Sequence, residues 1–267
     1  MKNLISTLIL AGSLVFNSYS QKVEKTENSS ALTSKDSVIK LNSEKEENLV
    51  TLAEFKGKPK VYREESIAVY ELFNSVGINP KDLYQKENKG KIKIEENSIV
   101  YLDASKIVLD SIYSSIGSFK NLRKLHLEDN GLENLPKEIG NLENLEILYL
   151  DNNNLKTLPK EIGALENLEE LYLGENKLKE LPKEIGNLKN LKTLYLDRNK
   201  LENLPKEIGN LKNLEILYLD NNHLKTLPKE IGNLENLEEL SLWNNQLDQE
   251  SKNLLNELRQ KRVEVIY

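Results

Sequence analysis

The sequence predicts an α/β solenoid, in which short repeated units stack side by side and contribute their strands to one parallel sheet. Two observations lead to this prediction. The chain matches itself at a constant 23-residue period, and every matching unit has the same spacing of apolar residues. The leucines that open successive units are Leu122, Leu145, Leu168, Leu191, Leu214 and Leu237. A period of roughly 20 to 50 residues is typical of stacked repeat architectures.

Each unit contains a short strand followed by a turn and a return path. In the unit that starts at Leu191, leucines at 194 and 196 alternate with outward positions, as in a strand with one buried face. Asn199 marks the turn after that strand, and Pro205 and Gly209 mark the return path. One unit alone buries too little apolar surface to fold. Stacked units share a continuous core, so the array requires a cap at each end.

The same period extends in both directions and gives seven repeats over residues 99–248. On the N-terminal side, a degenerate repeat places apolar residues or glycine at Ile99, Leu102, Leu109, Ile112, Ile116, Gly117 and Phe119. On the C-terminal side, Val263 and Val265 lie one full period beyond Leu240 and Leu242. In the segment before these valines, Leu254, Leu255 and Leu258 recur at helical spacing. Residues 249–267 are therefore predicted to form a C-terminal cap, a helix followed by a last strand.

The segments before the repeats are predicted to have three different roles. Residues 1–20 have a basic start, a short apolar run and small residues at Ser18 and Ser20, which are marks of a secretory signal cleaved after Ser20. Residues 21–50 are too polar to form a core and are predicted to be a flexible linker. Residues 51–98 are predicted to cap the array, with a helix around Val69 to Val76, a turn opened by Asn79 and Pro80, and a strand over 91–94.

The repeated pattern Leu-x-x-Leu-x-Leu-x-x-Asn, followed by Leu-Pro-x-x-Ile-Gly, resembles the leucine-rich repeat family. The likeness covers Ile99 to Tyr267 and is greatest to the bacterial, plant disease-resistance and Ras-scaffold type. It implies a horseshoe whose concave side is the parallel sheet, with the side chains between the leucines pointing outward from it. Bacterial ubiquitin ligases that carry such repeats need a catalytic cysteine, and this chain has none.

Composition excludes several function classes. The formal charge of -6 argues against a nucleic-acid binder, which needs a basic surface. Zero cysteines exclude a disulfide scaffold and a cysteine nucleophile, and His126 and His223 lie four repeats apart, too far to share a metal. Asp197 and Asp220 have a spacing that glycosidases use, but we expect them on an open, solvated sheet. No catalytic residue, metal site or cofactor is therefore predicted.

The candidate ligand-binding residues are those that vary between the fixed leucines. One column along the sheet contains His126, Tyr149, Tyr172, Tyr195 and Tyr218; a second contains Glu128, Asp151, Asp197, Asp220 and Trp243. Tyrosine and tryptophan give large, stiff contact areas with a polar tip, which suits protein recognition. The tyrosines could equally form a ladder that stabilises neighbouring strands, or be a by-product of repeat duplication.

The sequence therefore predicts an exported, non-enzymatic and monomeric binding module. Its concave face would take a protein or peptide ligand, and the acidic border favours a basic one. No segment after the signal is apolar enough to span a membrane. The alternative is a secreted structural or adhesive surface protein that binds a glycan, because tyrosines and carboxylates also suit sugars.

Overall fold

The structure is a computed structural model that describes residues 63–77, 92–96 and 98–267. All of these residues belong to one compact unit, Leu41–Tyr267. The predicted signal at 1–20, the linker at 21–50 and the turn at Asn79 and Pro80 lie outside the described residues. Among the described residues, the helices are too short or too polar to pass through a lipid bilayer.

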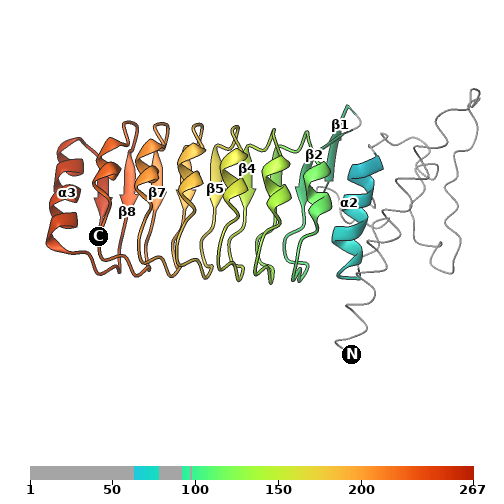
Figure 1. Cartoon of the computed structure of the whole chain (residues 1–267), viewed down its shortest axis with the longest axis horizontal. Coiled ribbons are helices and arrows are strands. Elements are labelled where there is room, and N and C mark those ends of the chain that lie inside the picture. Colours follow the sequence, from blue (N-terminus) through green and yellow to red (C-terminus); the bar gives the residue numbers. More distant parts are fainter. Residues whose placement is uncertain (1–62, 78–91, 97) are drawn as a thin grey trace, which may run out of the picture. The chain divides into compact units, whose positions relative to one another are not determined.

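Nine strands form one sheet in which spatial order follows chain order (Figure 1). The strands are β1 (Ile92–Glu95), β2 (Ser98–Asp103), β3 (Lys124–His126), β4 (Ile147–Tyr149), β5 (Glu170–Tyr172), β6 (Thr193–Tyr195), β7 (Ile216–Tyr218), β8 (Glu239–Ser241) and β9 (Glu264–Ile266). β1 is antiparallel to β2, and every later pair is parallel. The parallel sheet of the predicted solenoid is confirmed, with the register set by the repeat period from β2 to β8.

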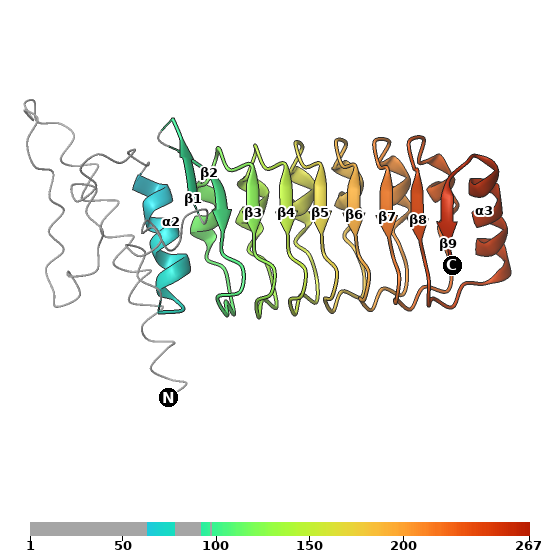
Figure 2. The ribbon, with the colours of Figure 1, turned by 180° about the vertical axis from the view of Figure 1, so that it is seen from behind.

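The return path of each repeat is a 3-10 turn on the opposite side of the core from the sheet (Figure 2). These turns are Ser114–Ser118, Lys137–Asn141, Lys160–Ala164, Lys183–Asn187, Lys206–Asn210 and Lys229–Asn233. A proline precedes each of the last five turns in an extended conformation. Leucines from the strands and isoleucines from the turns are buried between the two layers and form one continuous core. Packing between neighbouring repeats therefore stabilises the whole array.

The asparagine that follows each strand supplies the polar contacts between coils. The Oδ1 atom of Asn176 accepts from the Leu155 amide at 3.0 Å, and its Nδ2 atom donates to the carbonyls of Leu150, Leu173 and Gly174 at 2.9, 3.2 and 3.1 Å. The side chain is 6% exposed. From the sequence we expect such an amide to satisfy backbone groups of its own coil and of the next one. The partners in its own coil are confirmed, whereas the others lie in the preceding coil.

A second asparagine column, which we did not predict from the sequence, joins the coils on the return side. Asn167 donates to the Glu143 carbonyl and Asn190 to the Glu166 carbonyl, each at 2.8 Å. The same bond recurs from Asn144, Asn213 and Asn236. Both columns satisfy backbone carbonyls that the stacked coils would otherwise leave without partners.

The repeated glycines from Gly140 to Gly209 are required by close packing, whereas their place in the return path predicted that they permit a turn; Gly232, in the last repeat, has no such close contact. Among the described glycines only Gly77 has a positive φ, at 76°. A Cβ atom added to Gly140 would lie 2.5 Å from the Glu161 carbonyl oxygen of the next coil. The left-handed positions instead follow each strand at Asp129, Asn152, Glu175, Arg198, Asn221 and Asn244, with φ between 52° and 58°.

The N-terminal end of the core is covered by helix α2 (Arg63–Asn74). The predicted apolar face of this helix is confirmed, because Val69, Leu72 and Phe73 are buried. Glu65 on the same helix is 2% exposed, and its Oε2 atom accepts from the Ile99 amide of β2 at 2.9 Å. Burial raises the pKa of this carboxyl to about 7.

The C-terminal end is covered by helix α3 (Gln249–Gln260), which begins at an Asp248 cap that accepts from the Ser251 amide at 2.8 Å. Leu255 and Leu258 are buried under it. The expected match of the last strand is wrong by two positions. Leu240 pairs with Val265 and not with Val263, because the long helix replaces the short return turn.

Candidate functional site

The outward side chains of β2–β8, together with the polar residues that flank each strand, form what we call the strand face. Around β3 the flanking residues are Arg123, Glu128 and Asp129, and the same positions recur in each repeat. The centre of the strand face is a column of aromatic rings from neighbouring strands.

The parallel register brings all five predicted residues of this column into contact. The ring centroids are separated by 4.3 Å for His126 and Tyr149, 4.5 Å for Tyr149 and Tyr172, 4.9 Å for Tyr172 and Tyr195, and 4.5 Å for Tyr195 and Tyr218. The column predicted from the repeat spacing is therefore continuous from β3 to β7.

Tyr101 extends this column by one ring, and we did not predict it from the sequence. Its ring centroid lies 5.2 Å from that of His126. Tyr101 lies two positions before Asp103, which is the residue at the tyrosine position of β2. The alignment of repeats therefore pointed to Asp103, and only the long aromatic side chain of Tyr101 reaches the neighbouring column. We call these six rings, Tyr101, His126, Tyr149, Tyr172, Tyr195 and Tyr218, the aromatic ladder.

The ladder is not uniform along its length. The rings of Tyr149 and Tyr172 are nearly parallel, at 14°, as are those of Tyr195 and Tyr218, at 11°. The Tyr172 and Tyr195 rings are instead edge to face, at 81°. The stacked rings therefore form two blocks, His126 to Tyr172 and Tyr195 to Tyr218, which meet between β5 and β6, and the Tyr101 ring is tilted at 51° against His126.

Carboxylates fix the polar tips of two ladder tyrosines. The Tyr172 hydroxyl donates to Glu170 and the Tyr218 hydroxyl donates to Glu239, both at 2.7 Å. Burial and the neighbouring Glu170 raise the pKa of Tyr172, while the Glu239 carboxylate and burial raise the pKa of Tyr218. Both hydroxyls are therefore protonated at neutral pH and hold their rings in fixed positions.

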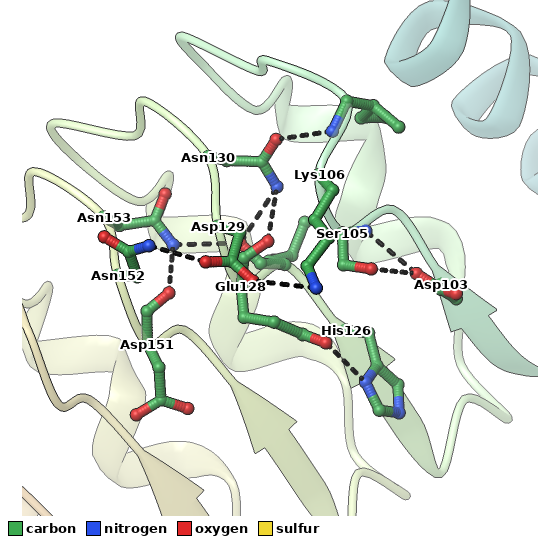
Figure 3. Close-up of polar contacts among 12 residues, drawn as sticks. Asp103, Ser105, Lys106, His126, Glu128, Asp129, Asn130, Asp151, Asn152 and Asn153 are labelled. Atoms are coloured by element: carbon green, nitrogen blue, oxygen red, sulfur yellow. Dashed lines mark hydrogen bonds and ion pairs between the residues drawn. The ribbon is translucent and has the colours of Figure 1, made fainter.

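The second predicted column runs alongside the ladder, just past the ends of the strands. We call its acidic members, Glu128, Asp151, Asp197 and Asp220, the carboxylate row. Glu128 is joined to the ladder because its Oε1 atom lies 3.2 Å from the His126 Nδ1 atom (Figure 3). The Glu128 Oε2 atom is buried without a hydrogen-bond partner among the described protein atoms.

Asp151 and Asp197 approach one another across Gly174, which occupies the same position in the repeat between them. Asp151 Oδ1 accepts from the Gly174 amide at 2.8 Å. A Cβ atom at residue 174 would lie 3.0 Å from Asp151 Oδ1 and 2.8 Å from Asp197 Oδ1. Glycine at this position leaves room for both carboxylates, and any larger side chain would push them apart.

The open, solvated setting expected for Asp197 and Asp220 is wrong for Asp197, and Asp151 is partly buried as well. Burial raises the pKa of Asp151 to about 6. The hydrogen bond from the Gly174 amide lowers this pKa in part, and the charge of nearby Asp197 raises it further. Burial likewise raises the pKa of Asp197. The cause is that Asp151 folds back onto the backbone of the next coil and so leaves bulk water.

The carboxylate row ends on the C-terminal side at Asp220, and Trp243 occupies the same position in the next repeat. Asp220 Oδ1 accepts from the Ser241 hydroxyl at 2.6 Å and from the Trp243 amide at 2.7 Å. The Trp243 side chain is 59% exposed, whereas the ladder tyrosines are half-buried. The structure thus places Trp243 beside the carboxylate row, at the end of the strand face and outside the aromatic ladder.

The strand face offers ring edges, hydroxyl groups and carboxylates, which suit hydrogen bonding and cation binding. No three His, Asp or Glu side chains in the described part of the chain converge in a way that could hold a metal ion. His223, the other histidine, is exposed in the turn after β7 and lies outside the ladder.

Comparisons with known proteins agree with this architecture. Residues 100–178 and 170–262 match a family model described as a leucine-rich repeat region. A leucine-rich repeat protein of Leptospira interrogans is 38% identical over 60% of this chain and 46% of its own, with a TM-score of 0.49. The PEPR1–AtPEP1 crystal structure is 30% identical over 62% of this chain and 27% of that chain, with a TM-score of 0.50.

The chain thus spans less than half the length of either solved structure. No curated protein matches it. The family model nevertheless covers more than half of the residues, and the strands, turns and buried asparagines recur with its period. The chain therefore belongs to the leucine-rich repeat family, whose members generally serve as non-enzymatic interaction scaffolds.

Proposed function

We propose that this chain is a non-enzymatic binding module whose strand face, the concave side of the expected horseshoe, recognises a protein or peptide ligand. The aromatic ladder carries this proposal. Six rings in contact, with two tips fixed by Glu170 and Glu239, give a large and stiff contact area. Stiff aromatic side chains lose little conformational entropy on binding, which favours them at recognition surfaces.

The finer features of the proposal follow from the sequence. The carboxylate row favours a basic ligand. The signal at residues 1–20 would direct export of the chain and be cleaved after Ser20, and we propose that the exported chain acts as a monomer. The PEPR1–AtPEP1 similarity supports an interaction role in general.

A glycan ligand on a structural or adhesive surface protein is the second candidate, favoured by one observation. Tyrosine rings bordered by carboxylates, as at Tyr195 and Asp197, also suit the apolar faces and hydroxyls of sugars. A pull-down with the purified repeats, before and after glycosidase treatment of the source, separates the two. A protein ligand survives the treatment, whereas a glycan ligand is lost.

The binding face is tested by substituting the ladder. The variant Tyr149→Ser/Tyr172→Ser/Tyr195→Ser/Tyr218→Ser removes four rings but leaves the buried leucines in place. It should stay folded by circular dichroism and lose the captured ligand. The matched control, Lys137→Ser/Lys160→Ser/Lys183→Ser/Lys206→Ser, changes four exposed residues of the return turns and should retain the ligand. A folded tyrosine variant that still captures the ligand would show that the ladder only stabilises strands.

A further inference from the structure

The charges of the repeats are segregated between the two sides of the core. Across residues 122–247, the strand face holds twelve acidic and four basic side chains, whereas the remaining positions hold eleven acidic and twelve basic ones. The net negative charge of the repeats therefore lies on the strand face. This uneven distribution creates a negative potential over the aromatic ladder.

Most basic residues of the strand face are paired with carboxylates outside the carboxylate row, so they leave the charge of the row itself without a basic partner. Lys192 lies 2.8 Å from Glu169, and Arg198 lies 2.7 Å from Glu175. Arg123 lies 4.0 Å from Glu146.

The carboxylate row differs from these paired carboxylates. Among the described residues, no lysine or arginine forms an ion pair with it. Asp151 and Asp220 instead accept from backbone amides, and Glu128 contacts His126. The row thus carries charge that an incoming cation can neutralise.

We infer that the ligand of the strand face is an extended protein segment that carries arginines, and that these lie along the carboxylate row beside the aromatic ladder. This inference rests on the proposed function and names the class of ligand. Glu128 and Asp151 lie on neighbouring repeats, as do Asp197 and Asp220, and neighbouring parallel strands are about 4.8 Å apart. Asp151 and Asp197 are two repeats apart, but their Oδ1 atoms both lie within 3.0 Å of the Cβ position over Gly174. The five donors of a guanidinium can reach two carboxylates at this spacing, whereas an ammonium acts as a single point charge.

The half-buried setting of the row also favours arginine over lysine. Asp151 and Asp197 are partly removed from water, so a ligand cation must lose part of its hydration to reach them. A guanidinium is more weakly hydrated than an ammonium and also stacks on aromatic rings. The chain itself contains a guanidinium placed over a tyrosine ring. The Arg259 guanidinium lies 4.5 Å from the centre of the Tyr267 ring and donates to the Val265 carbonyl at 2.8 Å.

The test uses two synthetic twelve-residue peptides of equal charge, one with arginine and one with lysine at every second position and glycine or serine between. Binding to the full chain is measured by fluorescence anisotropy at physiological salt. The arginine peptide should bind at least about fivefold more tightly than the lysine peptide. In the isosteric variant Asp151→Asn/Asp197→Asn/Asp220→Asn this advantage should disappear.

The control variant Glu138→Gln/Glu161→Gln/Glu184→Gln removes the same charge from the return turns and should keep the advantage. Equal binding of both peptides would overturn the inference about arginine and leave the strand face as a site for basic ligands. Failure of both peptides to bind would overturn the arginine inference and the basic ligand together. The tyrosine pull-down decides separately whether the strand face binds at all.

Discussion

Asp151 should cost the folded protein stability at neutral pH, and Asp151→Asn should recover it. Asparagine keeps the oxygen that accepts from the Gly174 amide but removes the partly buried charge. The pKa of about 6 lies roughly two pKa units above that of an ordinary aspartate, which corresponds to about 3 kcal/mol. Since the side chain is only half-buried, we halve this value for solvent screening and expect a gain of about 1.5 kcal/mol at pH 7.5.

The sign of the pH dependence follows from the raised pKa. The folded state holds the Asp151 proton more tightly than the unfolded state, so this contribution to stability is complete below about pH 4 and is lost as the pH rises through about 6. Urea unfolding of both proteins should therefore show the gain at pH 7.5 and almost none at pH 4. Asp110→Asn, which removes an exposed carboxylate, should change the unfolding free energy by less than about 0.5 kcal/mol. An equal gain at both pH values, or a loss at pH 7.5, would refute the reasoning.

Three further substitutions test how the array is held together. Asn176→Ala leaves the buried Leu155 amide without a partner and should lower the unfolding free energy by about 3 kcal/mol in urea, whereas a loss below about 1 kcal/mol would argue against the asparagine column. Leu196→Ala empties a fully buried site and should cost about 2–5 kcal/mol in the same assay; a cost no larger than that of Tyr195→Ser would contradict the assigned core. The melting temperature should fall as the pH rises through about 7, because the carboxylate of Glu65 on α2 is buried, and Glu65→Gln should flatten that fall.

The sequence by itself determined the repeat, the sheet and the column of tyrosines. A constant period with leucines at fixed positions permits only one register between neighbouring coils, since each unit must bury the same face against the next. Side chains at the same position of successive strands then lie side by side, so the contact of Tyr149 with Tyr172 was predictable from their spacing. The apolar faces of the two cap helices were predictable for the same reason, because helical spacing identifies the buried side.

Only the tertiary structure decided what depends on distances between coils. Tyr101 joins the ladder from a different position of its strand, which the alignment of repeats does not reveal. Val265 takes the place in the sheet predicted for Val263, because α3 takes more residues than a 3-10 turn to return to the sheet. Asp151 and Asp197 share the space over Gly174, and burial there raises both pKa values. The period fixes which residues are neighbours, whereas side-chain reach and access to water depend on how closely the coils pack.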